Sequence, residues 1–203
     1  MVFRSFDLKQ NLYWTEVKTE TAVVYREARQ LLEELGYTFE AVVIDGKKGV
    51  KEVFSDIPVQ VCQFHQMAIV TRYLTRRPKL EAGKELRVIA LALPELSENM
   101  LLLLLDAWRK KWEEFLKERT VNPLNPKKWF YTHRRIRSAY RSLKTNALYL
   151  FTYQRYPDLN IPNTTNSLDG SFKYLKQLIG IHNGLRRDRR WRLIEEVLAG
   201  FKH

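Results

Sequence analysis

A short apolar segment that ends in an acid, Val42–Gly46, constrains the fold of this chain most strongly. Val42–Ile44 are residues that favour strands, and an apolar run without polar alternation is typical of a strand buried on both faces. Asp45 follows at the C-terminal end, the edge where open α/β sheets bind ligands. Gly46 permits a sharp turn. The segment predicts an α/β fold with an acid placed for a metal ion or for proton transfer, although a simple Asp-Gly turn also accounts for these residues.

The chain is strongly basic. Of its 203 residues, 35 are Lys or Arg and 23 are Asp or Glu, which gives a formal net charge of +12. This excess predicts a polyanionic partner, of which nucleic acid is the commonest. A hydrophobic content of 45% argues against a disordered chain. Apolar runs such as Met100–Leu105 are too short to cross a membrane. The single cysteine excludes an internal disulfide and fits a reducing compartment.

The periodicity of apolar residues outlines the other elements. Residues 2–6 and 12–17 are rich in strand formers, and the loop between them predicts a hairpin. Two further strands are expected at residues 41–44 and 59–64. Helices are expected over residues 21–35, 49–54, 65–74, 81–93, 97–119, 134–150, 167–179 and 187–200. Pro94, Pro123 and Pro126 interrupt the helical region, and residues 157–166 are expected to form a loop.

A second dense polar segment spans Asn163–Phe172 and contains Asp169. An acid in the first turn of a helix is favoured by the helix dipole, and Asn166 or Ser167 is suited to capping that helix. The functional alternative places Asp169 beside Asp45, where two carboxylates bind divalent cations for phosphoryl chemistry. The residues alone leave both interpretations open.

Cys62 and His65 form a Cys-x-x-His element. Alone it is a weak zinc signal, because a structural zinc site needs four ligands and the other histidines have no cysteine nearby. The simpler interpretation is that Cys62 packs as a small apolar group while His65 faces a cleft or a phosphate.

Basic residues gather in two stretches of the sequence. The first is interleaved with Trp129, Phe130, Tyr131 and Tyr140, a pattern that suits a nucleic-acid backbone and an unstacked base. A charge run is often only a solvated face, but two runs and the overall charge favour nucleic acid. The residues predicted to contact DNA are Lys127, Lys128, Arg134, Arg135, Arg137, Arg141, Arg186, Arg187 and Arg190.

Together these segments resemble the Mutator-like DDE transposases and their bacterial insertion-sequence relatives. The resemblance is carried by Ile44-Asp45-Gly46 with Gly49, by Val59–His65, and by Asn163–Phe172, in that order along the chain. It implies an RNase H-like α/β core, incomplete at its N-terminus, that carries a large all-helical insertion. The implied division is residues 1–78 for the first part of the core, 79–156 for the insertion and 157–203 for the closing helices.

The resemblance also implies a function, namely metal-dependent DNA cleavage and strand transfer in transposition. It assigns Asp45 and Asp169 as catalytic metal ligands for Mg²⁺ or Mn²⁺, and Cys62 and His65 as residues that organise the site. Asp169 stands where the family usually has Glu. The implied partners are transposon-end and target DNA and other copies of the chain, without a membrane, and the implied location is the cytoplasm at the nucleoid.

The family's first catalytic Asp lies on a strand that precedes the hairpin expected at residues 2–17. We therefore expect this chain to be an N-terminally truncated transposase with impaired activity. Two alternatives stay open: a non-catalytic nucleic-acid-binding module, and a stand-alone RNase H-like nuclease. The nuclease needs a further carboxylate near Asp45, such as Asp7, Glu16 or Glu20.

Overall fold

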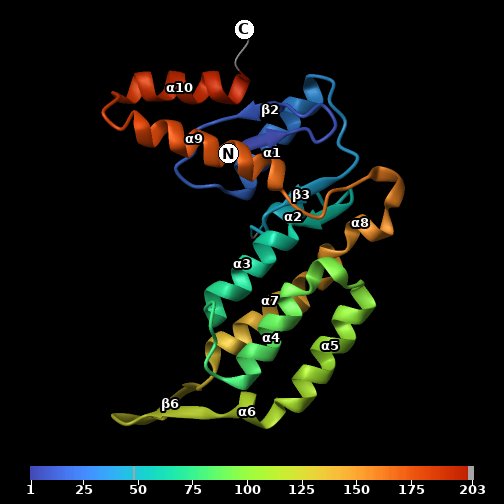
Figure 1. Ribbon diagram of the computed structural model, residues 1–203, viewed down its shortest axis with the longest axis vertical. Coiled ribbons are helices and arrows are strands. Elements are labelled where there is room, and N and C mark those ends of the chain that lie inside the picture. The colour runs from blue at the N-terminus through green and yellow to red at the C-terminus, as the bar shows by residue number, and fades with distance from the viewer. Residues whose placement is uncertain (48, 201–203) are drawn as a thin grey trace. The chain divides into compact units, whose positions relative to one another are not determined.

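The computed structural model describes residues 1–47 and 49–200 (Figure 1). Its chain forms two compact units: unit 1 comprises Met1–Phe39 and Thr165–His203, and unit 2 comprises Glu40–Thr164. The described residues form a mixed α/β structure of helices and three two-stranded sheets. Residues 40–78 thus share a unit with residues 79–156, whereas the sequence-based division separated them. No helix within the described ranges has the length and apolar character to span a membrane.

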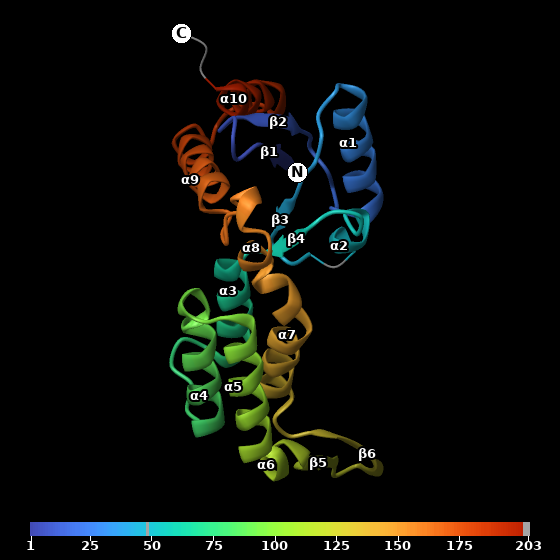
Figure 2. The ribbon, with the colours of Figure 1, turned by 90° about the vertical axis from the view of Figure 1, so that its right-hand side faces the viewer.

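Unit 1 combines both ends of the chain. Strands β1 (Val2–Arg4) and β2 (Asn11–Trp14) form the expected antiparallel hairpin. Helix α1 (Ala22–Glu34) follows, and the Thr21 hydroxyl caps it by accepting the Val24 amide. Helices α9 (Asn166–Ile181) and α10 (Arg187–Ala199) complete the unit. In Figure 2, α10 lies along β2, where the Asn11 side chain donates to the Leu198 carbonyl at 2.8 Å.

The sheet of unit 2 is a short parallel pair. Strands β3 (Val42–Ile44) and β4 (Val59–Val61) are in register, with Val42 opposite Val59 and Ile44 opposite Val61. The short helix α2 (Val50–Val53) lies in the connection between them. All of β4 is buried, and helices α7 (Arg134–Leu150) and α8 (Thr152–Arg155) pack against it. The apolar run at residues 42–44 therefore forms the strand that the sequence predicted.

The rest of unit 2 is mainly a helical bundle around helix α3 (Gln63–Leu74) and helix α7 (Arg134–Leu150), which pack closely together. Helices α4 (Glu81–Leu91) and α5 (Glu98–Lys111) pack beside them, and fully buried leucines fill the space between. Short elements complete the bundle: η1 (Leu93–Glu95), α6 (Glu113–Lys117), α8 (Thr152–Arg155) and η2 (Pro157–Leu159).

Trp108 anchors the bundle. Its ring stacks on Tyr140 with centroids 5.4 Å apart, and its indole N–H donates to the Ala82 carbonyl at 3.0 Å. The side chain is only 3% exposed. Trp108 therefore ties α5 to both α7 and α4, in agreement with its interpretation as a packing residue.

The expectation of an all-helical insertion at 79–156 is wrong at residues 119–131. This segment forms an antiparallel ribbon of β5 (Arg119–Asn122) and β6 (Asn125–Tyr131). Pro123 was interpreted as a helix breaker only. In the sequence Asn-Pro-Leu-Asn it also fits a tight turn, because proline presets the backbone angle of the second turn position. The flanking Val, Thr, Trp, Phe and Tyr residues then favour strands.

Candidate functional site

Asp45 lies at the C-terminal end of β3, exposed to solvent. Its Oδ1 accepts the backbone N–H of Lys47 at 2.9 Å, which closes a tight Asx turn. Gly46 has φ +87°, a conformation that strains any residue with a Cβ. A Cβ at Gly46 would lie 3.6 Å from Val61 Cγ1, so the turn also packs against the end of β4. The Asp-Gly pair therefore fixes the acid at the edge of the parallel sheet.

Cys62 and Gln63 continue from β4 at the same edge. The Cys62 amide donates to the Ile44 carbonyl at 2.8 Å, directly before Asp45, and the Cys62 side chain is fully buried. The Gln63 amide donates to the Asn163 carbonyl at 2.9 Å, and the Asn163 side-chain amide donates to Gln63 Oε1 at 3.2 Å. Segments that are far apart in the sequence therefore meet beside Asp45.

A buried glutamine network supports this junction. Gln60, Gln63 and Gln66 follow one another at a spacing of three residues and have no exposed surface. The side-chain amides of Gln60 and Gln63 both donate to the Leu150 carbonyl at 3.0 Å. Gln60 Oε1 in turn accepts the Tyr153 amide at 3.0 Å. The network joins the end of β4 to the end of α7.

Gln66 extends the network along α3 into α7. Its side-chain amide donates to Ser142 Oγ at 3.1 Å, and its Oε1 accepts the Asn146 side chain at 2.8 Å. Sequence reasoning missed this set. The available signal was the three regularly spaced glutamines within a segment that was otherwise expected to be buried, since buried amides need partners.

His65 is half-buried in the first turn of α3. The rings of Phe64 and His65 meet edge to face at 5.8 Å, and Phe64 is 51% exposed. Among the residues whose side chains the structure describes, which exclude Asp169, no three His, Cys, Asp or Glu side chains gather closely enough to hold a metal ion. The burial of Cys62 agrees with its interpretation as a packing residue.

Asp169 lies in helix α9 of unit 1, whereas Asp45 belongs to unit 2. The Asp169 side chain lies outside the described residues. The expected meeting of the two carboxylates therefore stays a prediction.

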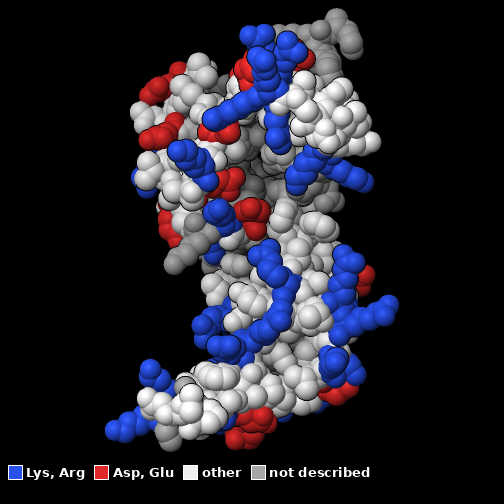
Figure 3. Space-filling view, turned by 90° about the vertical axis from the view of Figure 1, so that its left-hand side faces the viewer, with Lys and Arg blue, Asp and Glu red and all other residues white. Residues whose placement is uncertain are grey.

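The basic residues fall on both units. Lys127 and Lys128 lie on β6 and are exposed. The predicted arginines of α7 are exposed except Arg137, which is half-buried. Figure 3 shows Lys and Arg side chains gathered on one face of the helical unit, unit 2. In unit 1, Arg186, Arg187 and Arg190 are exposed at the start of α10, and Arg187 contacts Glu16 at 3.4 Å.

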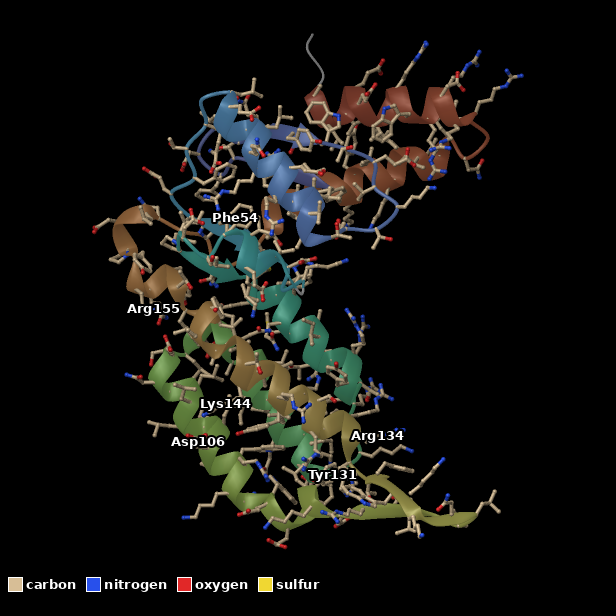
Figure 4. The ribbon with its side chains drawn as sticks, turned by 180° about the vertical axis from the view of Figure 1, so that it is seen from behind. Phe54, Asp106, Tyr131, Arg134, Lys144 and Arg155 are labelled. Carbon is tan, nitrogen blue, oxygen red and sulfur yellow. The ribbon has the colours of Figure 1, made fainter. Side chains whose placement is uncertain are left out.

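Three guanidinium groups lie over the aromatic rings of β6. Arg119 lies 3.9 Å from the centre of the Trp129 ring, Arg137 lies 3.6 Å from Tyr131, and Arg134 lies 4.7 Å from Phe130. Figure 4 shows Tyr131 and Arg134 at the junction of the ribbon with α7. Such cation–π pairs hold the charged groups in place beside the rings.

Ion pairs join the helices of the bundle. Lys144 of α7 pairs with Asp106 of α5 at 2.8 Å (Figure 4). Hydrogen bonds from Lys111 and Trp112 lower the pKa of Glu85 below its usual value. These carboxylates are thus engaged in holding helices together.

Comparison with known protein families, curated proteins and solved structures finds no match for this chain.

Proposed function

We propose that this chain takes part in metal-dependent DNA strand cleavage and transfer, as a transposase of the Mutator-like kind with an RNase H-like core. One observation carries the proposal: Gln63 is hydrogen-bonded to Asn163 beside the exposed Asp45. Two segments that carry the resemblance, 100 residues apart, are therefore neighbours at the carboxyl ends of parallel strands. That edge is the usual ligand site of open α/β sheets.

The donor chemistry of Asp45 fits a hard cation. Mg²⁺ and Mn²⁺ prefer carboxylate oxygen ligands, and Asp45 presents an exposed carboxylate at the sheet edge. Bound metal would activate water or a DNA 3′-hydroxyl and stabilise the leaving oxygen. The resemblance supplies Asp169 as the second ligand.

The chain's own residues have two tasks in this proposal. The turn at Asp45 and Gly46 orients the carboxylate, and Gln63 with Asn163 holds the neighbouring segment in register with it. Exposed Lys and Arg side chains bind the phosphates and so position the DNA without reading its sequence.

A plasmid-nicking assay with Mg²⁺ or Mn²⁺ tests the proposal. We expect nicking by the unmodified chain and its loss in Asp45→Asn. Asp158→Asn is the matched control, since Asp158 is also an exposed acid of unit 2, in η2. Nicking that survives Asp45→Asn, or that Asp158→Asn reduces equally, would refute the assignment of Asp45.

The exposed basic ribbon supports a second candidate, a nucleic-acid-binding module without catalysis. It predicts binding to duplex DNA that weakens steeply with salt, together with no nicking by any variant. The two candidates are therefore separated by the metal-dependent assay, and salt-insensitive binding would contradict both.

A further inference from the structure

The β5–β6 ribbon ends in an exposed apolar tip. Leu124 lies between the strands and is 95% exposed, the largest exposed fraction among the large hydrophobic residues described. Val121 is 50% exposed on the adjoining strand. The ribbon carries Arg119, Lys127 and Lys128 and no acidic residue. An apolar tip flanked by cationic side chains fits a polyanion that also offers an apolar interior, as a base step of DNA does.

The base of the ribbon is held firmly. The Thr132 amide donates to the Glu118 carbonyl at 3.0 Å, and His133 Nε2 lies 2.8 Å from Glu118 Oε2. The His133 ring stacks on Phe115 with centroids 3.6 Å apart. Arg137 donates to the Leu116 carbonyl at 2.6 Å. These contacts fix the base of both strands to α6 and α7.

The ribbon extends well beyond its base. Figures 1 and 2 show it projecting from the helices of unit 2. At about 3.3 Å per residue, the seven residues Asn125–Tyr131 span roughly 20 Å. A two-stranded ribbon of this kind fits a groove of duplex DNA.

The aromatic residues of β6 are already occupied on one side. Arg119, Arg134 and Arg137 lie over their rings, and Trp129 meets Tyr131 edge to face at 5.3 Å. An unstacked base would have to displace a guanidinium to use those ring faces. The pairs reduce the ring surface available to an unstacked base, although Trp129 and Phe130 keep 45% and 41% of their surface exposed. Leu124 at the turn is the most exposed apolar side chain described in the ribbon.

We propose that the β5–β6 ribbon lies along a groove of duplex DNA and that Leu124 inserts between base pairs, bending the duplex. Lys127 and Lys128 bind the flanking phosphates. Apolar side chains that enter a base step unstack it and kink the duplex, and the bent duplex then contacts more of the protein. The inference rests on the proposed function in one respect, that DNA is the ligand.

Fluorescence energy transfer between dyes at the two ends of a duplex of about 30 base pairs tests this inference, with EDTA present so that no strand is cut. We expect the unmodified chain to raise the transfer above that of unbound DNA. Leu124→Ser should remove at least about half of that rise while weakening binding less than about tenfold. Lys127→Ala with Lys128→Ala should instead weaken binding and lower the salt slope by about two.

Leu8→Ser is the matched control, because Leu8 is a 56% exposed leucine in the loop of the β1–β2 hairpin. It should bend DNA as the unmodified chain does. Three results would overturn the inference: no bending at saturation, equal bending by Leu124→Ser and Leu8→Ser, or a Leu124-dependent attachment to anionic phospholipid vesicles without DNA binding. Loss of nicking with intact bending would refute only the proposed catalysis, so the two failures are distinguishable.

Discussion

Replacing Gln63 with leucine removes the side-chain amide that bonds to Asn163 beside Asp45, while the backbone hydrogen bond between the two residues stays. The Gln63 side chain has no exposed surface, donates to the Leu150 carbonyl and accepts from the Asn163 side chain. Leucine has a similar size, so the main change is the loss of hydrogen bonds. The Leu150 carbonyl keeps the Gln60 amide as a donor, whereas the Asn163 side chain loses its Gln63 acceptor.

The expected loss of stability follows from that difference. A donor left without its acceptor in a mostly buried site costs about 1–3 kcal/mol, and the lost bond to a carbonyl that keeps another donor costs about 1 kcal/mol. Leucine recovers part of this through its apolar surface. We expect Gln63→Leu to lower the free energy of unfolding by about 2 kcal/mol.

Urea unfolding measures this loss. With an m-value of about 2 kcal/mol/M, the midpoint should fall by about 1 M. A double-mutant cycle with Asn163→Ala should give a coupling of about 1 kcal/mol, because the two residues share a contact. A midpoint unchanged by Gln63→Leu, or full additivity of the two substitutions, would refute the role of this pair.

Three further substitutions test other contacts. Hydrogen bonds from its partners lower the pKa of Glu85, so the ionised carboxylate stabilises the fold relative to Glu85→Gln. This extra stability should be present above pH about 4.5 and disappear as the pH falls through the lowered pKa. Urea unfolding midpoints measured across this pH range test the prediction. Gly46→Ala should lower the free energy of unfolding by about 1 kcal/mol in the same assay. A methyl group fits in the available space, so the loss comes from backbone strain at φ +87°, and an unchanged free energy would contradict that strain. Trp108→Phe should cost about 1–3 kcal/mol by thermal unfolding, since the Ala82 carbonyl loses the indole donor; a loss as small as that of an exposed substitution would contradict this.

Much of the local structure could be predicted from the sequence. Helix α7 spans Arg134–Leu150, the predicted bounds, because its apolar residues repeat at helical spacing over five turns. Strand β3 and the hairpin of unit 1 were also predicted. These elements are set by interactions between residues close in sequence, which periodicity reports directly.

The ribbon depends on strand pairing and the glutamine network on contacts between distant residues, neither of which the local sequence pattern predicted. Pro123 has the same effect on a helix whether a loop or a turn follows, so the β5–β6 pairing was missed. Gln60 could be placed on a strand, but its partner carbonyl at Leu150 lies 90 residues away. The exposed position of Asp45 followed from its place after a buried strand, whereas the Gln63–Asn163 bond depends on tertiary packing.

Unit 1 is assembled from two distant stretches of chain, with all of unit 2 encoded between them. During synthesis, unit 2 has its whole sequence once Thr164 has left the ribosome. Strand β2 packs against α10, and the Asn11 side chain donates to the Leu198 carbonyl at the end of that helix. These contacts form only after α10 has been synthesised. We therefore expect unit 2 to fold before unit 1 during synthesis, with Met1–Phe39 unprotected from protease until helix α10 emerges.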